Sequence, residues 1–120
     1  MKSKLYFFCL LLSLSISAQN SSYDPISALA SEIKASHATK EARAKAAFNW
    51  VANTIRYDIN EYEHINFTGT IRYDSEAALN KALRAIDLKI INRTWQQKAS
   101  VCEGYALLFK ELCDLMDIEC

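Results

Sequence analysis

The sequence has little of the two residues that interrupt regular structure, with 2 Gly and 1 Pro in 120 residues. This scarcity excludes collagen-like and linker-like chains. It also lacks an excess of charge of one sign, because 14 Lys and Arg residues balance 14 Asp and Glu residues. Balanced charge excludes a strongly basic nucleic-acid-binding protein, which needs surplus cations to neutralise phosphates. Because 51% of the residues are hydrophobic, we expect one folded domain rather than a disordered chain.

No apolar run reaches the roughly 20 residues that cross a bilayer. The longest run, Leu5–Leu14, follows two lysines and precedes small residues that end at Ala18. This layout predicts a secretory signal peptide over residues 1–18 and therefore an exported protein with no stable membrane span after cleavage. A buried N-terminal helix or a retained anchor is the alternative. Residues 19–23 are then a flexible lead, and 24–120 form the domain.

Apolar side chains recur at helical spacing in four segments, which predicts a mainly α chain of about four helices. Asp24 can cap the first helix, with Pro25 in its first position, and Thr39 can cap a second helix over residues 40–55. Asp74 or Ser75 can cap the third, whose stripe either continues as far as residue 95 or gives way to a separate turn. A fourth begins near residue 100.

Residues 56–73 lose the helical period and carry several aromatic side chains. A loop of this length without structure of its own is uncommon in a compact domain unless it serves binding. A short hairpin with its turn near Thr68 and Gly69 is the alternative. The sequence leaves both interpretations open.

The start of the fourth helix carries the most chemical information. Ser100 and Glu103 have the spacing of a capping box, which would place Cys102 in the second helical position. A thiolate is stabilised by the partial positive charge at a helix N-terminus, and free backbone N–H groups there can hold an oxyanion. Gly104 would let another backbone approach. The alternative is a structural cysteine buried at a helix end.

Three cysteines follow the predicted signal peptide, and an odd number in an exported protein suggests a free, reactive thiol. Cys102 and Cys113 lie eleven residues apart, about 16 Å along a helix, so they cannot form a disulfide. We expect Cys113 and Cys120 to be two buried apolar thiols, and a Cys113–Cys120 bond is the geometrically conceivable alternative. We expect Cys113 to pack in the core.

A cysteine nucleophile also needs a base. The only histidines are His37, in a predicted turn, and His64, in the aromatic segment. Both are expected to be exposed side chains, although His64 could approach Cys102 in the fold. The spacing of His, Cys, Asp and Glu matches no metal-binding motif, so we expect neither a metal nor a cofactor.

Three stretches carry a resemblance to a known family: Val101–Ala106 (VCEGYA), its helical continuation Leu107–Cys113, and an upstream segment over Lys40–Val51 and Asn53–Asp58. Together they resemble the bacterial transglutaminase-like superfamily over roughly residues 24–120. Val101–Ala106 is similar to the family's nucleophile motif, and the upstream segment is similar to the helix before its active-site lobe.

The resemblance implies a papain-like α+β domain in which helices pack on an antiparallel sheet. It implies a Cys-His-Asp triad with Cys102 as the catalytic nucleophile. The family's His and Asp follow the nucleophile helix, so residues 24–120 are expected to be the N-terminal helical lobe of a longer domain. The implied activity is peptidase, amidase or acyl-transferase chemistry on a protein or peptide substrate. Tyr57 and Trp95 are candidates for lining the substrate cleft.

Two alternatives do not involve catalysis. The chain could be a secreted binding or assembly module that keeps the helical lobe as a surface. It could also be a helical secreted domain whose nucleophile-like motif has arisen by chance, in which case we expect a closed bundle with Cys102 buried.

Overall fold

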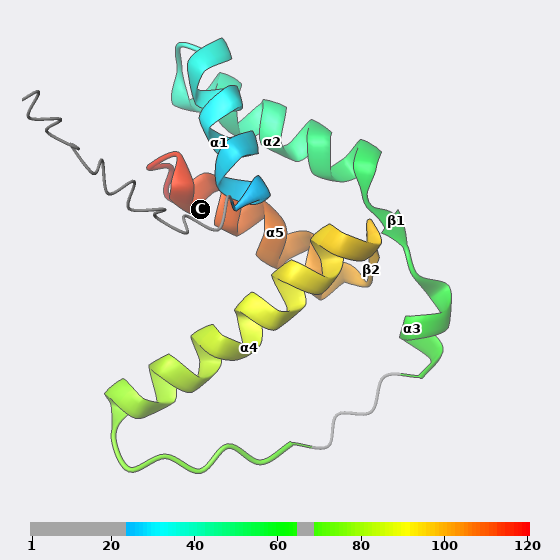
Figure 1. Ribbon diagram of the computed structural model, residues 1–120, viewed down its shortest axis with the longest axis vertical. Helices are drawn as coiled ribbons and strands as arrows, with labels where there is room; N and C mark the ends of the chain where they lie inside the picture. Colours follow the sequence, from blue (N-terminus) through cyan, green and yellow to red (C-terminus); the bar gives the residue numbers. More distant parts are fainter. Residues whose placement is uncertain (1–23, 65–68) are drawn as a thin grey trace, which may run out of the picture.

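The computed structural model describes residues 24–64 and 69–120. The predicted signal peptide, the lead over 19–23 and Thr68 of the predicted turn lie outside the described residues. Within the described part the chain is mainly helical, as predicted, with five helices and one two-stranded sheet. The elements in chain order are α1 (Pro25–Ser36), α2 (Lys40–Thr54), β1 (Arg56–Tyr57), α3 (Ile59–Glu63), α4 (Glu76–Gln97), β2 (Ala99–Ser100) and α5 (Cys102–Leu115) (Figure 1).

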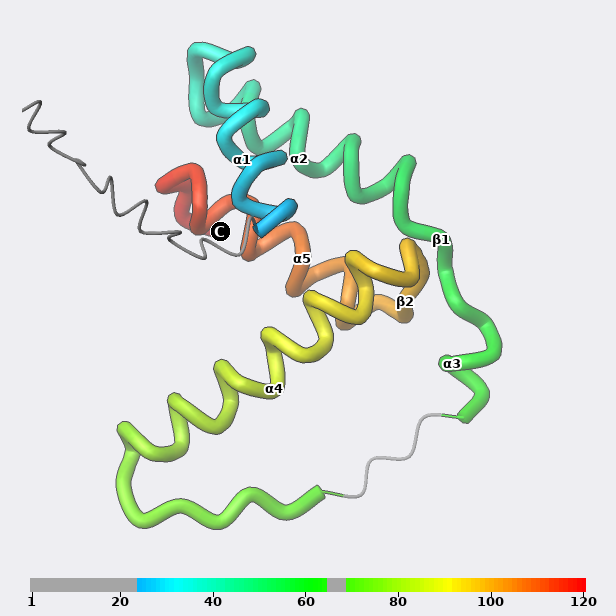
Figure 2. Tube along the Cα trace, viewed as in Figure 1, coloured from blue at the N-terminus to red at the C-terminus, as the bar shows by residue number. Residues whose placement is uncertain are grey.

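The central element is α5. It packs against α1, α2 and α4, and Figure 2 shows it lying between the α1–α2 pair and the C-terminal end of α4. Aliphatic side chains from these four helices and from the segments that follow α2 and α5 form a single buried cluster. Its members are Ile26, Ala30, Ile33, Ala47, Val51, Ile55, Ile91, Leu108, Leu112 and Met116.

Side-chain caps explain where three of the helices begin. An oxygen of the Asp24 side chain accepts a hydrogen bond from the Ile26 N–H at 3.1 Å, with Pro25 in the first turn of α1. Thr39 caps α2 in the same way through the N–H of its third residue, at 3.2 Å. Ser75, rather than Asp74, caps α4, also at 3.2 Å. These local signals are the ones that the sequence predicts.

The stripe of the third predicted helix continues without a break, so α4 is one helix of 22 residues. Its C-cap is Lys98, which adopts the left-handed conformation with φ 50°. Across residues 24–64 and 69–120, none of the helices is both long enough and apolar enough to cross a membrane.

The segment after α2 does not pair with its own continuation. β1 pairs in parallel with β2, with Arg56 opposite Ala99 and Tyr57 opposite Ser100. The Arg56 N–H donates to the Lys98 carbonyl at 2.8 Å. A hairpin at this strand is therefore incorrect, because its partner lies about forty residues later. The aromatic segment also contains the short helix α3.

The capping box at the start of α5 is also incorrect. Ser100 belongs to β2, and its side chain is fully buried without a hydrogen-bond partner among the described residues. Val101 occupies the N-cap position in an extended conformation. The helix therefore begins at Cys102, one position later than the capping box predicts, so Cys102 is its first residue.

Candidate active site

Cys102 carries a free, exposed thiol at the first position of a 14-residue helix. No described side chain caps this helix end. The N–H groups of Gly104 and Tyr105 both point to the Val101 carbonyl, at 3.1 and 3.4 Å. The N–H groups of Cys102 and Glu103 precede them and belong to the helix positions that have no intrahelical partner. Together with the helix dipole, they form a site that can stabilise an anion next to the sulfur.

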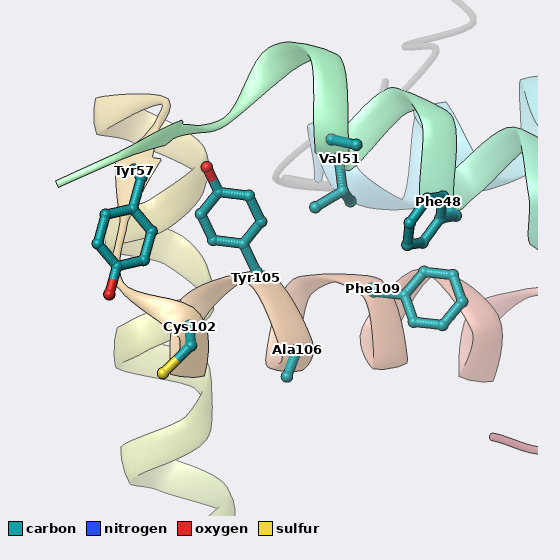
Figure 3. Close-up of a pocket in the computed structure, with 8 residues that line it drawn as sticks. Phe48, Val51, Tyr57, Cys102, Tyr105, Ala106 and Phe109 are labelled. Carbon is teal, nitrogen blue, oxygen red and sulfur yellow. The ribbon is translucent and has the colours of Figure 1, made fainter.

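An open groove of about 450 Å³ begins at this thiol. It runs between the adjacent faces of α2 and α5, and its lining is apolar apart from the thiol and two tyrosine hydroxyls (Figure 3). At the far end, Phe48 and Phe109 meet edge to face with ring centres 6.2 Å apart, and Phe48 remains 60% exposed. The lining residues are Phe48, Val51, Ala52, Tyr57, Cys102, Tyr105, Ala106 and Phe109.

Two tyrosines fix the geometry at the thiol end of the groove. The Tyr105 hydroxyl donates to the Ile55 carbonyl at 2.5 Å, which ties the first turn of α5 to the end of α2. The ring of Tyr57 packs 6.3 Å from that of Tyr105. Figure 3 shows the Tyr57 hydroxyl pointing to the same side of the groove as the Cys102 sulfur.

The environment of Tyr57 favours its protonated form. Desolvation in the groove raises the pKa of Tyr57 above its ordinary value, and negative charge on the nearby Cys102 sulfur raises it further. The phenol therefore stays neutral near neutral pH and can donate a hydrogen bond. Tyr57 was predicted from the sequence to line a cleft, and it lines this groove. The β1–β2 pairing that brings it beside Cys102 was not predicted.

Gly104 is required because two buried side chains pack closely against it. A Cβ at this position would lie 2.0 Å from the Ser100 Oγ and 2.4 Å from the Thr94 Oγ1. Both hydroxyl-bearing residues are fully buried. The neighbours that approach Gly104 are therefore side chains rather than the second backbone expected from the sequence. The signal for this contact is the glycine itself, in the first turn of an otherwise ordinary helix.

The second aromatic candidate, Trp95, does not line the groove. Its ring stacks on Trp50 with centres 5.0 Å apart, and the Lys98 Nζ lies 3.4 Å from the centre of the Trp95 ring. Burial lowers the pKa of Lys98. This cation–π stack covers the junction between α4 and β2 and serves packing rather than the thiol site.

Neither histidine reaches the groove. The Nδ1 atom of His37 lies 3.1 Å from the Ile33 carbonyl oxygen, and that of His64 lies 2.7 Å from the Asn60 carbonyl oxygen. Each ring is thus held by its own helix end, and the groove lining contains no histidine among the residues that the structure describes. The same described ranges contain no group of His, Cys, Asp and Glu that could hold a metal ion.

Comparison of the chain with protein-family models, curated proteins and solved structures gave no match.

Proposed function

We propose that this chain belongs to an exported, transglutaminase-like cysteine enzyme that cleaves amide bonds in protein or peptide substrates, with Cys102 as the nucleophile. The observation that carries the proposal is the exposed thiol at the uncapped first turn of α5, at the mouth of an apolar groove. The motif around Cys102, with its resemblance to the family's nucleophile motif, supports the same assignment. A papain-like domain and export are parts of this proposal.

The proposed reaction is acyl transfer. The Cys102 sulfur attacks the carbonyl carbon of an amide, a C–S bond forms, and the carbonyl oxygen gains negative charge. The free N–H groups of Cys102 and Glu103 stabilise that oxyanion. Collapse of the intermediate breaks the C–N bond, the amine leaves with a proton, and water then hydrolyses the thioester. The resemblance assigns the proton transfers to a histidine that follows the nucleophile helix, not to His37 or His64.

The thiol itself can be tested without a known substrate. Trypsin cleaves after Lys98 and Lys110, so Cys102 is recovered in peptide 99–110 and the other exposed thiol, Cys120, in the peptide that begins at residue 111. We expect iodoacetamide to modify Cys102 at least about tenfold faster than Cys120 near neutral pH, because only Cys102 lies beside the uncapped N–H groups of a helix N-terminus. Equal rates at the two exposed thiols would contradict the proposal.

A second candidate function is a non-catalytic binding or assembly module, which the absence of a histidine from the described groove lining favours. Cys102→Ala separates the two functions. The comparison uses a chain that contains the histidine implied after the nucleophile helix, and loss of amide hydrolysis in this variant, with the helical circular dichroism spectrum unchanged, supports the enzyme. Activity that survives Cys102→Ala would refute the proposed role of the thiol.

A further inference from the structure

The groove that begins at Cys102 is hollow because small side chains lie between its ends. Its lining residues on α5 follow the spacing of one helix face, and so do those on α2. Ala106 lies between the thiol and the far end on α5, and Ala52 occupies the facing part of α2; both are exposed. The space that these two residues leave open is about 450 Å³, which lies within the range of small-molecule sites.

Aromatic rings stand at both ends of this hollow. Four of the eight lining residues are aromatic, whereas aromatic residues make up 11% of the chain. The rings of Tyr57 and Tyr105 lie 6.3 Å apart at the thiol end, and those of Phe48 and Phe109 lie 6.2 Å apart at the other. Aromatic rings attract one another at centre separations of about 4.5–7 Å. The lining therefore suits a further aromatic ring better than an aliphatic chain.

Phe48 is the lining side chain that leaves the most aromatic surface open. It contacts Phe109 edge to face, which fixes its orientation, yet 60% of the residue remains exposed. Figure 3 shows the two rings side by side at the end of the groove away from the Cys102 sulfur. Phe48 is also absent from the buried cluster and from the side chains packed against it. Its ring is therefore available to a ligand that enters the groove.

The length of the groove matches a side chain close to the attacked bond. Seven residues of α5 separate Cys102 from Phe109, which is about 10 Å along the helix axis. One residue of an extended peptide spans about 3.3 Å, and alternate side chains point to the same side. With an amide carbonyl at the sulfur, the hollow is thus reached by a side chain that lies within two residues of that amide.

We propose that the groove selects substrates with an aromatic side chain within two residues of the attacked amide, and that Phe48 is a specificity-determining residue. The inference rests on the function proposed for Cys102, since a substrate subsite needs a group that attacks the substrate. An aromatic ring in the hollow leaves water and covers Phe48. A polar side chain would lose its hydrogen bonds to water, and the Tyr105 hydroxyl is already bonded to the Ile55 carbonyl.

The test uses thiol-directed probes, which react with Cys102 without any further catalytic group. N-benzyl, N-cyclohexylmethyl and N-(2-hydroxyethyl) iodoacetamide share one reactive group and differ only in the side group that would enter the groove. The full chain is labelled near neutral pH and digested with trypsin, and mass spectrometry gives the labelling rate at each cysteine.

Cys120 provides the reference thiol within the same chain. Cys113 is fully buried, as predicted, but Cys120 is exposed because it lies beyond the end of α5. The prediction of two buried thiols is therefore wrong for Cys120. Since Cys120 does not line the groove, the benzyl-to-hydroxyethyl rate ratio at Cys120 measures the intrinsic difference between the probes. We define the benzyl preference as this ratio at Cys102 divided by the same ratio at Cys120.

We expect a benzyl preference of at least about tenfold, which is the gain expected from burying one aromatic side group. The N-benzyl probe should also exceed the N-cyclohexylmethyl probe at Cys102 by about two- to tenfold, because ring pairs attract beyond the area that they bury. A benzyl preference near one would overturn the inference, and equal benzyl and cyclohexylmethyl rates would overturn the aromatic class. Equal rates of plain iodoacetamide at Cys102 and Cys120 would instead refute the proposed function, and the subsite with it.

Two opposite substitutions test the groove itself. Phe48→Ala removes the open ring, and Ala52→Phe fills the hollow, so each should lower the benzyl preference at least about threefold. Both positions are exposed and lie outside the buried cluster, and circular dichroism checks that the helices are kept. Tyr73→Ala is the matched control, because Tyr73 is 57% exposed and does not line the groove. A full preference in Phe48→Ala, or a loss as large in Tyr73→Ala, would overturn the role of Phe48.

Discussion

Replacing Gly104 by alanine should destabilise the protein, although alanine is the better helix former. The added Cβ would lie 2.0 Å from the Ser100 Oγ, 2.5 Å from the Ser100 Cβ and 2.4 Å from the Thr94 Oγ1. Favourable contacts between heavy atoms occur at about 3.5–4.0 Å, so all three are severe overlaps. Rotating the Ser100 hydroxyl relieves one contact but not the one with its Cβ. The backbone of β2 or of α5 must therefore move.

The magnitude follows from two opposing terms. Helix propensity favours alanine over glycine by about 1 kcal/mol. Overpacking a buried site costs about 1–3 kcal/mol, and the upper end applies here because both neighbours of Gly104, Thr94 and Ser100, are fully buried. We therefore expect Gly104→Ala to lower the free energy of unfolding by about 2 kcal/mol. The same displacement moves the first turn of α5, so alkylation of Cys102 should also change.

Urea unfolding, followed by circular dichroism and analysed with a constant m-value, measures this change in the free energy of unfolding. Gly69→Ala is the matched control, because the described residues leave nothing within 4 Å of its added Cβ and neither glycine has a positive φ. We expect this control to stay within about 0.5 kcal/mol of the parent. A Gly104→Ala variant as stable as the parent would refute the close packing between α4, β2 and α5.

Three further outcomes can be measured. Thr39→Ala should lower the free energy of unfolding, measured with urea, by about 1 kcal/mol because it removes a helix cap. Ser100→Ala should change it by almost nothing, because the Ser100 hydroxyl is buried without a hydrogen-bond partner among the described residues. A cost of about 1 kcal/mol at Ser100 would instead support the capping box. Spectrophotometric titration should place the pKa of Tyr57 above 10.0, and Cys102→Ala should lower it partway toward that value. The hydrogen bond from Lys34 lowers the pKa of Asp117 below its ordinary value of 3.8. The free energy of unfolding should therefore fall as the pH drops below 3.8 and through the folded-state pKa, and Asp117→Asn should lack this part of the fall.

The helices could be predicted from the sequence because their signals are local. Asp24 and Thr39 bond to N–H groups two or three residues away, and the apolar stripes repeat within each helix. The β1–β2 pairing could not be predicted, since two-residue strands carry no periodic pattern and their partners are distant in the sequence. Ser100 illustrates the consequence: its spacing from Glu103 fits a cap, but the pairing of its backbone with β1 turns its side chain inward.

The candidate site was likewise predicted only in part. Cys102 could be found because a helix start is a local feature, and its position was wrong by a single residue. Tyr57 and Trp95 both looked like cleft residues, yet only Tyr57 lines the groove. Trp95 stacks on Trp50, a partner on another helix about forty-five residues earlier. Sequence composition identifies aromatic residues, but only tertiary contacts decide which of them face a groove and which face each other.

The exposure of Cys102 follows from the strand before it as much as from its helix. Ala99, Ser100 and Val101 are all buried, so the chain first reaches solvent at the residue where α5 begins. A serine cap would have occupied one of the N–H groups of the first turn. Because Ser100 is instead held in β2, those groups stay available beside the thiol, and the same pairing brings Tyr57 to it. The short sheet thus positions the Cys102 thiol, the free N–H groups of the first turn of α5 and the Tyr57 phenol together.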